Sequence, residues 1–261
     1  MQHANNNIER KDLMGFFTHP GTEKDYFDFI QSSISGASKS TIYYHNLHTI
    51  YLYLTSGEYR KSFIGKTVIV DGMGALFLYK LAGWSLSRDC RLTYVDFIIP
   101  LMEMARDQGW RVFHIGQDAQ VQQDAFAAIK RKVPGIDISG HHGYFDLSDS
   151  SADTRQVVDK VNAFKADLVL VGLGSTAQEL WVDANRNKLD ASVVMVCGSC
   201  MEYVAGKVKT APRWMGRAGL EMFFRLYADP KRLAFRYLVE PFLLLFVLLR
   251  NRVRPRSGTD Y

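Results

Sequence analysis

Apolar runs and amphipathic segments alternate along the middle of the chain. Four runs are apolar at most positions, namely 66–70, 110–116, 166–174 and 191–198, and the short run 136–140 has isoleucine at two alternate positions. Segments with helical spacing of apolar residues come after them, namely 72–83, 118–132, 154–165, 176–188 and 199–207. Continuous apolar strands are typical of a parallel sheet buried on both faces, and their alternation with helices predicts right-handed βαβ units. The pattern therefore predicts an α/β fold with a Rossmann-like, mostly parallel sheet flanked by helices.

The first 55 residues have a weaker pattern. We interpret residues 1–25 as a polar lead-in, residues 26–34 as a helix, and residues 41–54 as an apolar run of unassigned type. The N-terminus has no apolar stretch of the kind that a secretory signal contains, so we expect no such signal. No segment reaches the roughly 20 apolar residues that cross a bilayer.

After Lys207 the pattern becomes that of an appendage. The apolar positions of an amphipathic helix follow at Leu220, Phe223, Phe224 and Tyr227. Pro230 interrupts this helix, and a second one is predicted around residues 234–238. The apolar run 242–249 is too short to span a membrane, but it suits insertion into one leaflet or a dimer contact. We therefore predict an α/β domain over 1–206 and a helical, membrane-associating appendage over 207–261.

Charge is distributed unevenly along the chain. The whole sequence has a net charge of +5, whereas residues 207–261 contain 12 basic and 4 acidic residues. A nearly neutral body with a basic, aromatic-rich end indicates a polyanionic partner, and nucleic acid and anionic lipid are both candidates on charge alone. The hydrophobic fraction of 47% supports a core without disulfides, and three cysteines are consistent with a reducing cytoplasm.

Asp71 is the first candidate for chemistry, because ligands of parallel sheets bind beyond the carboxyl ends of the strands. It ends a predicted strand and begins a turn that contains glycine. A carboxylate there can act as a general base on a sugar hydroxyl. It can also cap the following helix, and position alone favours the cap.

A second candidate is the strand-to-helix junction in 171–181, where two glycines precede a Ser-Thr pair. Backbone N–H groups at such a junction can receive a diphosphate, although a tight turn with a capping hydroxyl is the structural alternative. Gln178 and Glu179 lie in the first turn of this helix, where they can face a ligand. The CxxC pair Cys197 and Cys200 has no second pair, which favours burial over a metal site.

Six segments together resemble the WecG/TagA/CpsF family of bacterial glycosyltransferases (glycosyltransferase family 26). They are HNLHT (45–49), VDGMGALFLYKLAG (70–83), RLTYVD (91–96), GHHGYF (140–145), VGLGSTAQELW (171–181) and AGKVKTAPRWMGRAGLEMFFRL (205–226). The resemblance covers residues from about 40 to about 240, and its most specific part lies in 205–226.

The resemblance implies roles for individual residues. Asp71 is expected to be the catalytic base, and Arg91 is expected to meet the donor diphosphate, with Arg88 as the alternative if the alignment is shifted. The expected substrate-binding residues are Asn46, His48, Asp96, Tyr144, Gly174, Gln178, Glu179 and Glu202. Within this set, Tyr144 is expected to stack on uracil and Glu202 to accept ribose hydroxyls.

The sequence also departs from the family pattern. Tyr44 and His45 stand before Asn46 where the family has a threonine, and Tyr94 replaces a glycine. Before Gln178 the family's Pro-Lys is Thr176-Ala177, and after Glu179 its lysine is Leu180. These departures leave the donor specificity and the level of activity open.

The leading hypothesis is an inverting glycosyltransferase that moves a sugar from a UDP-sugar to a polyprenyl-diphosphate-linked saccharide during surface polysaccharide biosynthesis (exopolysaccharide, capsule or teichoic-acid type). The family is described as lacking the DxD metal motif, and the chain has none, so we expect neither a cofactor nor a required metal. We expect a cytoplasmic, peripheral protein on the anionic inner face of the membrane, with no nucleic-acid partner and with a homo-oligomer left open. Two alternatives are a non-catalytic, membrane-bound auxiliary subunit of another glycosyltransferase and a different Rossmann-type enzyme that binds a nucleotide or dinucleotide.

Overall fold

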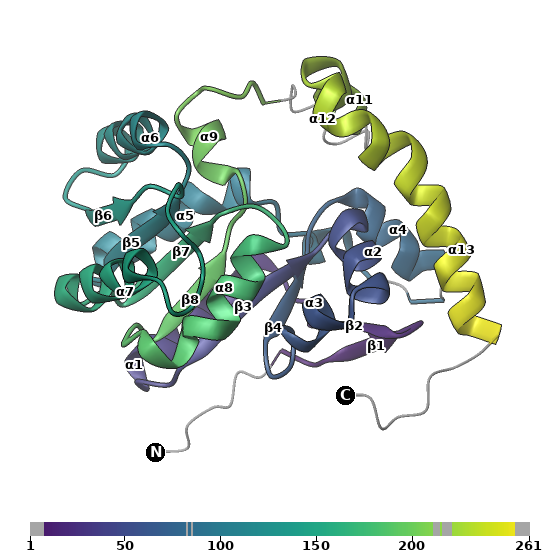
Figure 1. The fold of residues 1–261 in the computed structure, drawn as a ribbon, viewed down its shortest axis with the longest axis horizontal. Coiled ribbons are helices and arrows are strands. Elements are labelled where there is room, and N and C mark those ends of the chain that lie inside the picture. The colour runs from purple at the N-terminus through teal and green to yellow at the C-terminus, as the bar shows by residue number, and fades with distance from the viewer. Residues whose placement is uncertain (1–7, 82, 85, 211–214, 216–220, 254–261) are drawn as a thin grey trace.

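A six-stranded sheet forms the centre of the computed structural model, which describes residues 8–81, 83–84, 86–210, 215 and 221–253 (Figure 1). The strand order is β4-β3-β8-β7-β5-β6, and all neighbours are parallel. The strands are β3 (Ser40–His45), β4 (Thr67–Val70), β5 (Arg111–Gly116), β6 (Asp137–His141), β7 (Leu168–Gly172) and β8 (Val193–Val196). The predicted parallel α/β fold is confirmed.

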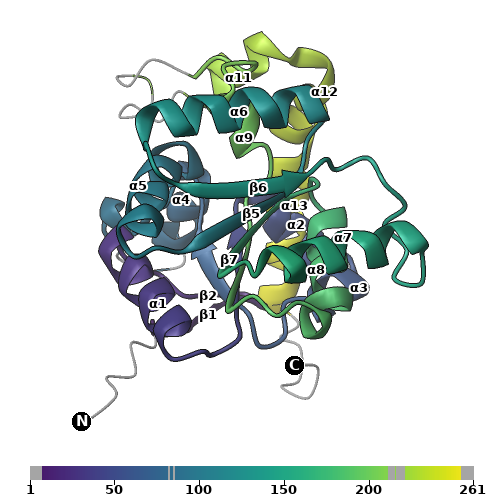
Figure 2. The same ribbon diagram turned by 90° about the vertical axis from the view of Figure 1, so that its left-hand side faces the viewer.

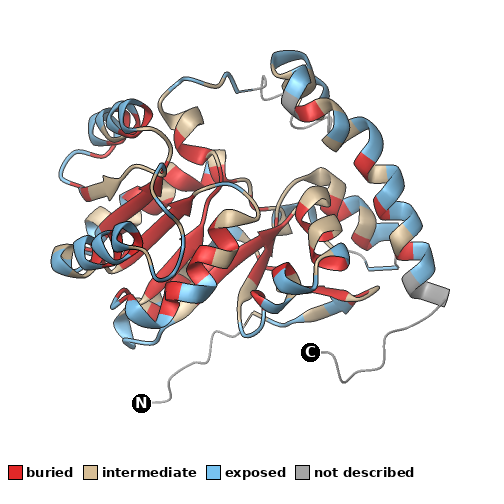
Figure 3. Ribbon diagram, in the orientation of Figure 1, coloured by how far each residue is buried: buried red, intermediate tan, exposed pale blue. Residues whose placement is uncertain are grey.

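The strands supply the core of the protein (Figure 3). All four residues of β8 are fully buried, and so are Val68, Ile69 and Val70 of β4. Burial of a side chain of this size stabilises a fold by about 1.5–3 kcal/mol. The continuous apolar runs of the sequence therefore hold the strand ends in fixed positions.

Helices cover both faces of the sheet. Figure 2 shows α1 and α5 on one side and α7 and α8 on the other, and the stacked rings of Phe27 and Phe97, 4.8 Å apart, join α1 to α5. The helices around the sheet are α1 (Glu23–Ser35), α2 (Leu47–Thr55), α3 (Gly57–Lys61), α4 (Met73–Leu81), α5 (Tyr94–Asp107), α6 (Ala119–Lys132), α7 (Ala152–Phe164), α8 (Ala177–Asn185) and α9 (Cys200–Val204). Two 3-10 turns, η1 (Arg88–Cys90) and η2 (Arg186–Lys188), accompany them. The helices predicted after the apolar runs are confirmed as α4, α6, α7, α8 and α9.

The unassigned apolar run 41–54 contains both a strand and a helix. Asn46 separates β3 from α2 because its side chain accepts a hydrogen bond from the N–H of Thr49 at 3.1 Å. The hydroxyl oxygen of Thr49 in turn accepts from the N–H of Asn46 at 2.8 Å, which completes a capping box.

The interpretation of residues 1–25 as a polar lead-in is wrong for the described part of that range. Strands β1 (Lys11–Leu13) and β2 (Phe16–Thr18) form an antiparallel hairpin. Phe16 is buried, and the hydroxyl of Thr18 donates to the carbonyl of Val68 at 2.7 Å. The hairpin therefore packs against the edge strand β4, where it protects backbone groups from solvent.

The C-terminal segment consists of α11 (Glu221–Ala228), α12 (Pro230–Ala234), the π-helical turn η3 (Phe235–Val239) and α13 (Glu240–Val253). The break at Pro230 is confirmed, whereas Leu220 lies outside the described residues. Helix α13 packs along α2 (Figure 1), with Leu244 buried and Phe242 exposed. Among the described residues, no helix has both the length and the apolar character needed to cross a membrane.

Candidate active site

Two polar residues follow the neighbouring strands β3 and β4. His45 pairs with Val70 across these strands, so the next residues, Asn46 and Asp71, leave the sheet side by side. The side-chain Nδ2 of Asn46 donates to a carboxylate oxygen of Asp71 at 3.3 Å. The backbone N–H of Asp71 donates to the carbonyl of His45 at 2.8 Å, which fixes the start of the turn.

The glycines of this turn leave the Asp71 carboxylate in the cleft. Helix α4 begins at Met73, so Gly72 occupies the capping position, and its φ of +82° favours glycine. A Cβ on Gly74 would lie 2.6 Å from a methyl carbon of Leu47. Glycine at this position thus allows α4 to approach α2 closely. Asp71 stands one residue before the cap, and its carboxylate accepts from Asn46 instead.

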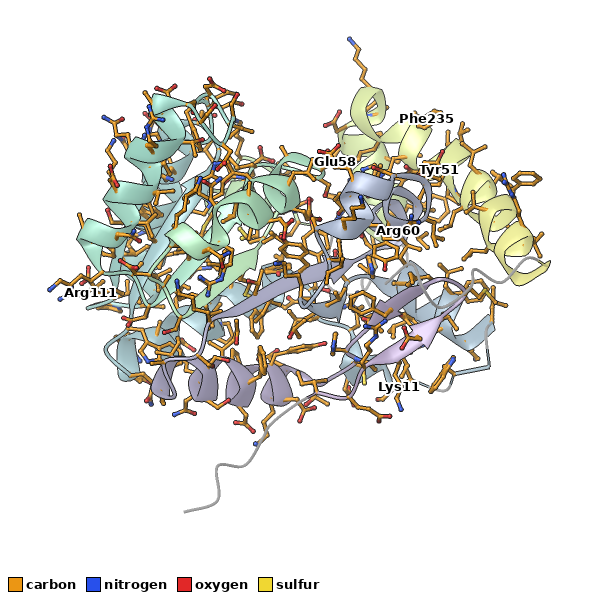
Figure 4. All side chains as sticks on the ribbon, turned by 60° about the horizontal axis from the view of Figure 1, so that its bottom comes forward. Lys11, Tyr51, Glu58, Arg60, Arg111 and Phe235 are labelled. Carbon is orange, nitrogen blue, oxygen red and sulfur yellow. The ribbon has the colours of Figure 1, made fainter. Side chains whose placement is uncertain are left out.

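Two cavities meet beside this pair. The first, of about 390 Å³, lies between the ends of β3 and β4 and the C-terminal helices, and Asp71 and Phe77 line it. The second, of about 490 Å³, extends to Ser199 and Tyr203 beyond β8. Four residues line both cavities, namely His48, Arg225, Arg236 and Tyr237. Figure 4 labels Tyr51 of α2 and Phe235 of η3, which come from facing elements and also line the second cavity.

The surroundings of Asp71 set its basicity. Burial raises the pKa of the Asp71 carboxyl above its ordinary value. Arg225, the hydrogen bond from Asn46, Arg236 and Arg91 oppose this rise, in that order. A carboxylate with a raised pKa is a stronger base than a surface aspartate, and the cationic groups keep an ionised form available.

Arg91 lies beside the end of β4, but it lines neither of the two cavities. It forms an isolated parallel bridge with Val70, and the N–H of Leu92 donates to the carbonyl of Val70 at 2.9 Å. This short pairing extends the sheet beyond β4 and brings the positive charge of Arg91 close to the carboxylate. The alternative, Arg88, lies on the exposed turn η1.

His48 contacts the C-terminal segment. Its Nδ1 lies 2.7 and 2.9 Å from the two carboxylate oxygens of Glu240, which is 4% exposed. Burial and the charge of Arg236 lower the pKa of His48, although Glu240 opposes them. A carboxylate only accepts, so Nδ1 of His48 carries the hydrogen and donates it to Glu240. Arg236 also donates to Oδ1 of Asn46 at 3.3 Å.

Gln178 and Glu179 line neither of these cavities, and both are fully buried. Nε2 of Gln178 donates to the hydroxyl of Tyr44 at 3.2 Å, and Oε1 accepts from the N–H of Gly198 at 3.2 Å. Gln178 thus joins β3 to the end of β8. Burial raises the pKa of Glu179 to about 7. The described contacts of this pair are structural.

Glycines bring the ends of β5, β7 and β8 together. A Cβ on Gly116 would lie 2.5 Å from the carbonyl oxygen of Gly172, and a Cβ on Gly172 would lie 2.5 Å from that of Gly198. Nε2 of Gln117 donates to the carbonyls of Gly172 and Gly198 at 3.1 Å each. Only glycine permits this approach, so the strand ends present backbone rather than side chains. Tyr144, 77% exposed, follows the next strand, β6.

The remaining expected residues lie in three different places. Asp96 is exposed on α5 and faces Glu23 at the start of α1, whose pKa is raised by burial and then by the charge of Asp96, so Asp96 is not brought to Asp71. Gly174, with a φ of +81°, lies in the turn before α8, and its carbonyl accepts from the N–H of Gln178 at 3.0 Å. Glu202 lies in the first turn of α9. Within the described part of the chain, no group of three or more His, Cys, Asp or Glu residues could hold a metal ion.

Arg225 and Arg236 are cavity residues that the sequence pattern did not single out. Both belong to the appendage, more than 150 residues from Asp71, so no local spacing links them to it. The usable signal is composition, because each arginine lies among aromatic residues, in FFRLY and AFRYL. An arginine among apolar residues of a helix can bury its stem against the protein while its charged head reaches a cavity or solvent.

Comparison with known proteins gives a consistent picture. Residues 11–258 match the model of the glycosyl transferase WecG/TagA/CpsF family. Two similar relatives are the N-acetylglucosaminyldiphosphoundecaprenol N-acetyl-beta-D-mannosaminyltransferases of Staphylococcus aureus strains NCTC 8325 / PS 47 and COL. Each is 28% identical to this chain over 197 residues, which cover 76% of this chain and 72% of the relative.

Proposed function

Because the chain belongs to the WecG/TagA/CpsF family of glycosyltransferases, we propose that it transfers a sugar from a UDP-sugar to a polyprenyl-diphosphate-linked saccharide with inversion. The product would enter a bacterial surface polysaccharide. The observation that carries this proposal is the half-buried carboxylate of Asp71 in a cavity that Arg225 and Arg236 also line.

Asp71 acts as the base in this proposal. Its carboxylate takes the proton of the acceptor hydroxyl while the hydroxyl oxygen bonds to the anomeric carbon of the donor. The bond between that carbon and the diphosphate breaks, and UDP leaves with the electron pair. A single displacement of this kind inverts the anomeric configuration. The hydrogen bond from Asn46 holds the carboxylate in one orientation and leaves its other oxygen for the acceptor.

The arginines stabilise the leaving diphosphate. Arg225 and Arg236 line both cavities, so they lie between the base and the space that extends to Ser199. An arginine pairs with phosphate oxygens through two parallel N–H donors, and fixed positive charge lowers the barrier where negative charge develops. Arg91 adds a third cation beside Asp71.

We assign the donor nucleotide to the glycine-rich ends of β5, β7 and β8. Backbone approaches closely there, and the second cavity reaches Ser199 at the start of α9. Tyr144 is exposed enough to stack on uracil, and Glu202 is available for the ribose hydroxyls. This arrangement directs the sugar of the donor toward Asp71.

The first cavity suits the lipid-linked acceptor. Met73, Phe77 and Met222 make part of its wall apolar, and Phe77 is 59% exposed, so the apolar wall continues to the surface. A polyprenyl chain has to remain in lipid while its saccharide reaches the base. The exposed apolar side of α13 favours attachment to the cytoplasmic face of the membrane as a peripheral protein.

The non-catalytic alternative finds less support. Two departures from the family pattern, Tyr44 and Tyr94, are both buried, and their rings contact each other at 5.6 Å between centroids. The two residues therefore pack against each other within the core. Neither residue lines the cavity that contains Asp71.

The test is release of UDP by the purified full-length chain. The relatives are named as N-acetylmannosaminyltransferases, so the first mixture contains UDP-N-acetylmannosamine and polyprenyl-diphosphate N-acetylglucosamine, followed by other UDP-sugars. We expect UDP release that depends on the acceptor and is lost in Asp71→Asn. UDP binding without turnover on any pair would favour the auxiliary subunit. Thermal protection by NAD rather than UDP would favour a different nucleotide enzyme.

A further inference from the structure

Two contacts join the C-terminal segment to the start of α2. The carboxylate of Glu240 accepts from Nδ1 of His48 at 2.7 and 2.9 Å. One helical turn earlier, Arg236 donates to Oδ1 of Asn46 at 3.3 Å. The same amide donates from Nδ2 to Asp71. Side-chain contacts therefore run from the candidate base through Asn46 to Arg236, and the helix backbone connects Arg236 to Glu240, the first residue of α13, which is bonded to His48.

The local helix geometry sets the direction of the Arg236 side chain. Arg236 and Tyr237 lie in η3, a π-helical turn between α12 and α13. A π-helical turn is wider than an α-helical one and redirects the side chains that it carries. Glu240 follows this turn immediately, and its carboxylate is buried against α2 rather than in solvent.

We infer that Glu240 is a positioning residue for the transfer reaction, because its bond to His48 holds Arg236 against Asn46 and beside Asp71. The inference rests on the proposed role of Asp71 as the base. His48, which the family resemblance suggested as a substrate ligand, then acts through Glu240. Neither His48 nor Glu240 needs to touch the reacting atoms.

The charges around Asp71 determine in which direction its pKa shifts when Glu240 or Arg236 is changed. Burial raises the pKa of Asp71, and Arg236 is one of three arginines that oppose the rise, with Arg225 of α11 and Arg91 beside β4. Loss of the Glu240 carboxylate alone removes a negative charge from α13, which would lower the pKa of Asp71. Displacement of Arg236 removes a positive charge, which would raise it. His48 is not among the groups that shift the pKa of Asp71.

The experiment follows the titration of Asp71 in the full-length chain. The carboxyl carbon is observed by 13C NMR after aspartate labelling and is assigned with Asp71→Asn. We expect Arg236→Gln to raise the pKa of Asp71 by about one unit, the lower end of the effect of a nearby opposite charge. Glu240→Ala and His48→Phe should each raise it in the same direction. The double variant of His48 and Glu240 should raise the pKa no further, because both substitutions break the same hydrogen bond.

A conservative variant and a matched control complete the design. His48→Asn keeps an N–H donor near the position of Nδ1, so it should restore the wild-type pKa of Asp71. Lys231→Gln removes an exposed charge on α12 and should leave the pKa of Asp71 unchanged. In active preparations of the variants that raise the pKa of Asp71, the acid limb of the kcat/KM profile should move to higher pH together with that pKa. In the same variants kcat should fall by a larger factor than KM rises.

Two results would overturn the inference. One is an Asp71 pKa that is unchanged or lowered in folded Glu240→Ala, and the other is an unchanged value in Arg236→Gln. The NMR titration needs no turnover, so it decides the role of Glu240 even if the chain releases no UDP. A failure of the proposed function would instead appear as the absence of UDP release by the wild-type chain. That measurement does not use the positioning variants.

Discussion

The amide of Asn46 donates to the carboxylate of Asp71 at 3.3 Å, across the ends of two neighbouring parallel strands. The same amide oxygen accepts from the N–H of Thr49 and therefore caps α2. One side chain thus fixes the start of a helix and the orientation of the candidate base. A site built on strand ends and helix starts is more rigid than one built on loops.

The first prediction concerns the base. Asp71→Asn keeps the size of the side chain and its place beside Asn46 but removes the ability to accept a proton. Transfer should fall by at least about 100-fold, the lower end of the effect of a general base. UDP affinity, measured by calorimetric titration, should stay near the wild-type value. Near-wild-type turnover would falsify the assignment.

The second prediction separates two arginines that differ in position. Arg91 lies beside Asp71 on a short extension of the sheet, whereas Arg88 lies on the exposed turn η1. Arg91→Ala should weaken UDP binding about 10-fold or more, because a charge-assisted bond to phosphate contributes on the order of 1.5–3 kcal/mol. Arg88→Ala is the matched control and should bind UDP like the wild type. Equal losses in both variants would contradict the placement of the diphosphate.

The third prediction concerns stability and pH. Burial raises the pKa of Glu179 from 4.5 to about 7 in the folded protein. Between these values the folded state keeps a proton that the unfolded state releases, so the free energy of unfolding falls as pH rises through this window. At about 1.4 kcal/mol for each pKa unit, the loss above pH 7 is on the order of 3 kcal/mol.

Glu179→Gln should remove this dependence, because the amide oxygen still accepts from Gln178 and carries no proton that titrates. Urea unfolding at pH 5 and pH 8 measures the effect, and the variant should gain on the wild type only at pH 8. Glu103→Gln, on an exposed position of α5, is the matched control. If the free energy of unfolding changes equally with pH in the wild type and in Glu179→Gln, the carboxylate of Glu179 is not the source of the pH dependence.

Local pattern predicted the strands and helices that position Asp71 because those elements are long and continuously apolar. It missed β1 and β2, since a strand of three residues has no detectable period. The boundary between β3 and α2 was available in principle, because Asn46 and Thr49 have the spacing of a capping box. An apolar run on both sides of Asn46 obscured it.

The roles of site residues were harder to predict than their elements. Gln178 lies at a helix start, where a ligand is as plausible a partner as the core, and only tertiary contacts with Tyr44 and Gly198 decide between them. Arg225 and Arg236 reach the cavity from the far end of the chain. Their positions depend on how α13 docks on α2, which no local pattern encodes.

The last prediction concerns the exposed side of α13. Leu244 and Leu248 are buried against the protein, whereas Phe242 is 73% and Phe246 is 67% exposed. Exposed aromatic side chains next to a basic chain end favour a lipid surface, where each basic residue contributes on the order of 1 kcal/mol. The same exposed side could instead form a contact between two copies of the chain, which is the simpler structural alternative.

Phe242→Ser with Phe246→Ser should therefore reduce co-sedimentation with anionic vesicles and lower transfer to a lipid-linked acceptor. The substitutions leave the buried side of α13 intact, so thermal unfolding should change little. Truncation before Pro241 should have the same effect on vesicle binding, and it should spare the folding of residues 1–206. Vesicles of zwitterionic lipid provide the control, because they lack the charge that the basic residues recognise. Undiminished sedimentation of the double variant, together with a change from dimer to monomer in ultracentrifugation, would assign this side of α13 to self-association instead.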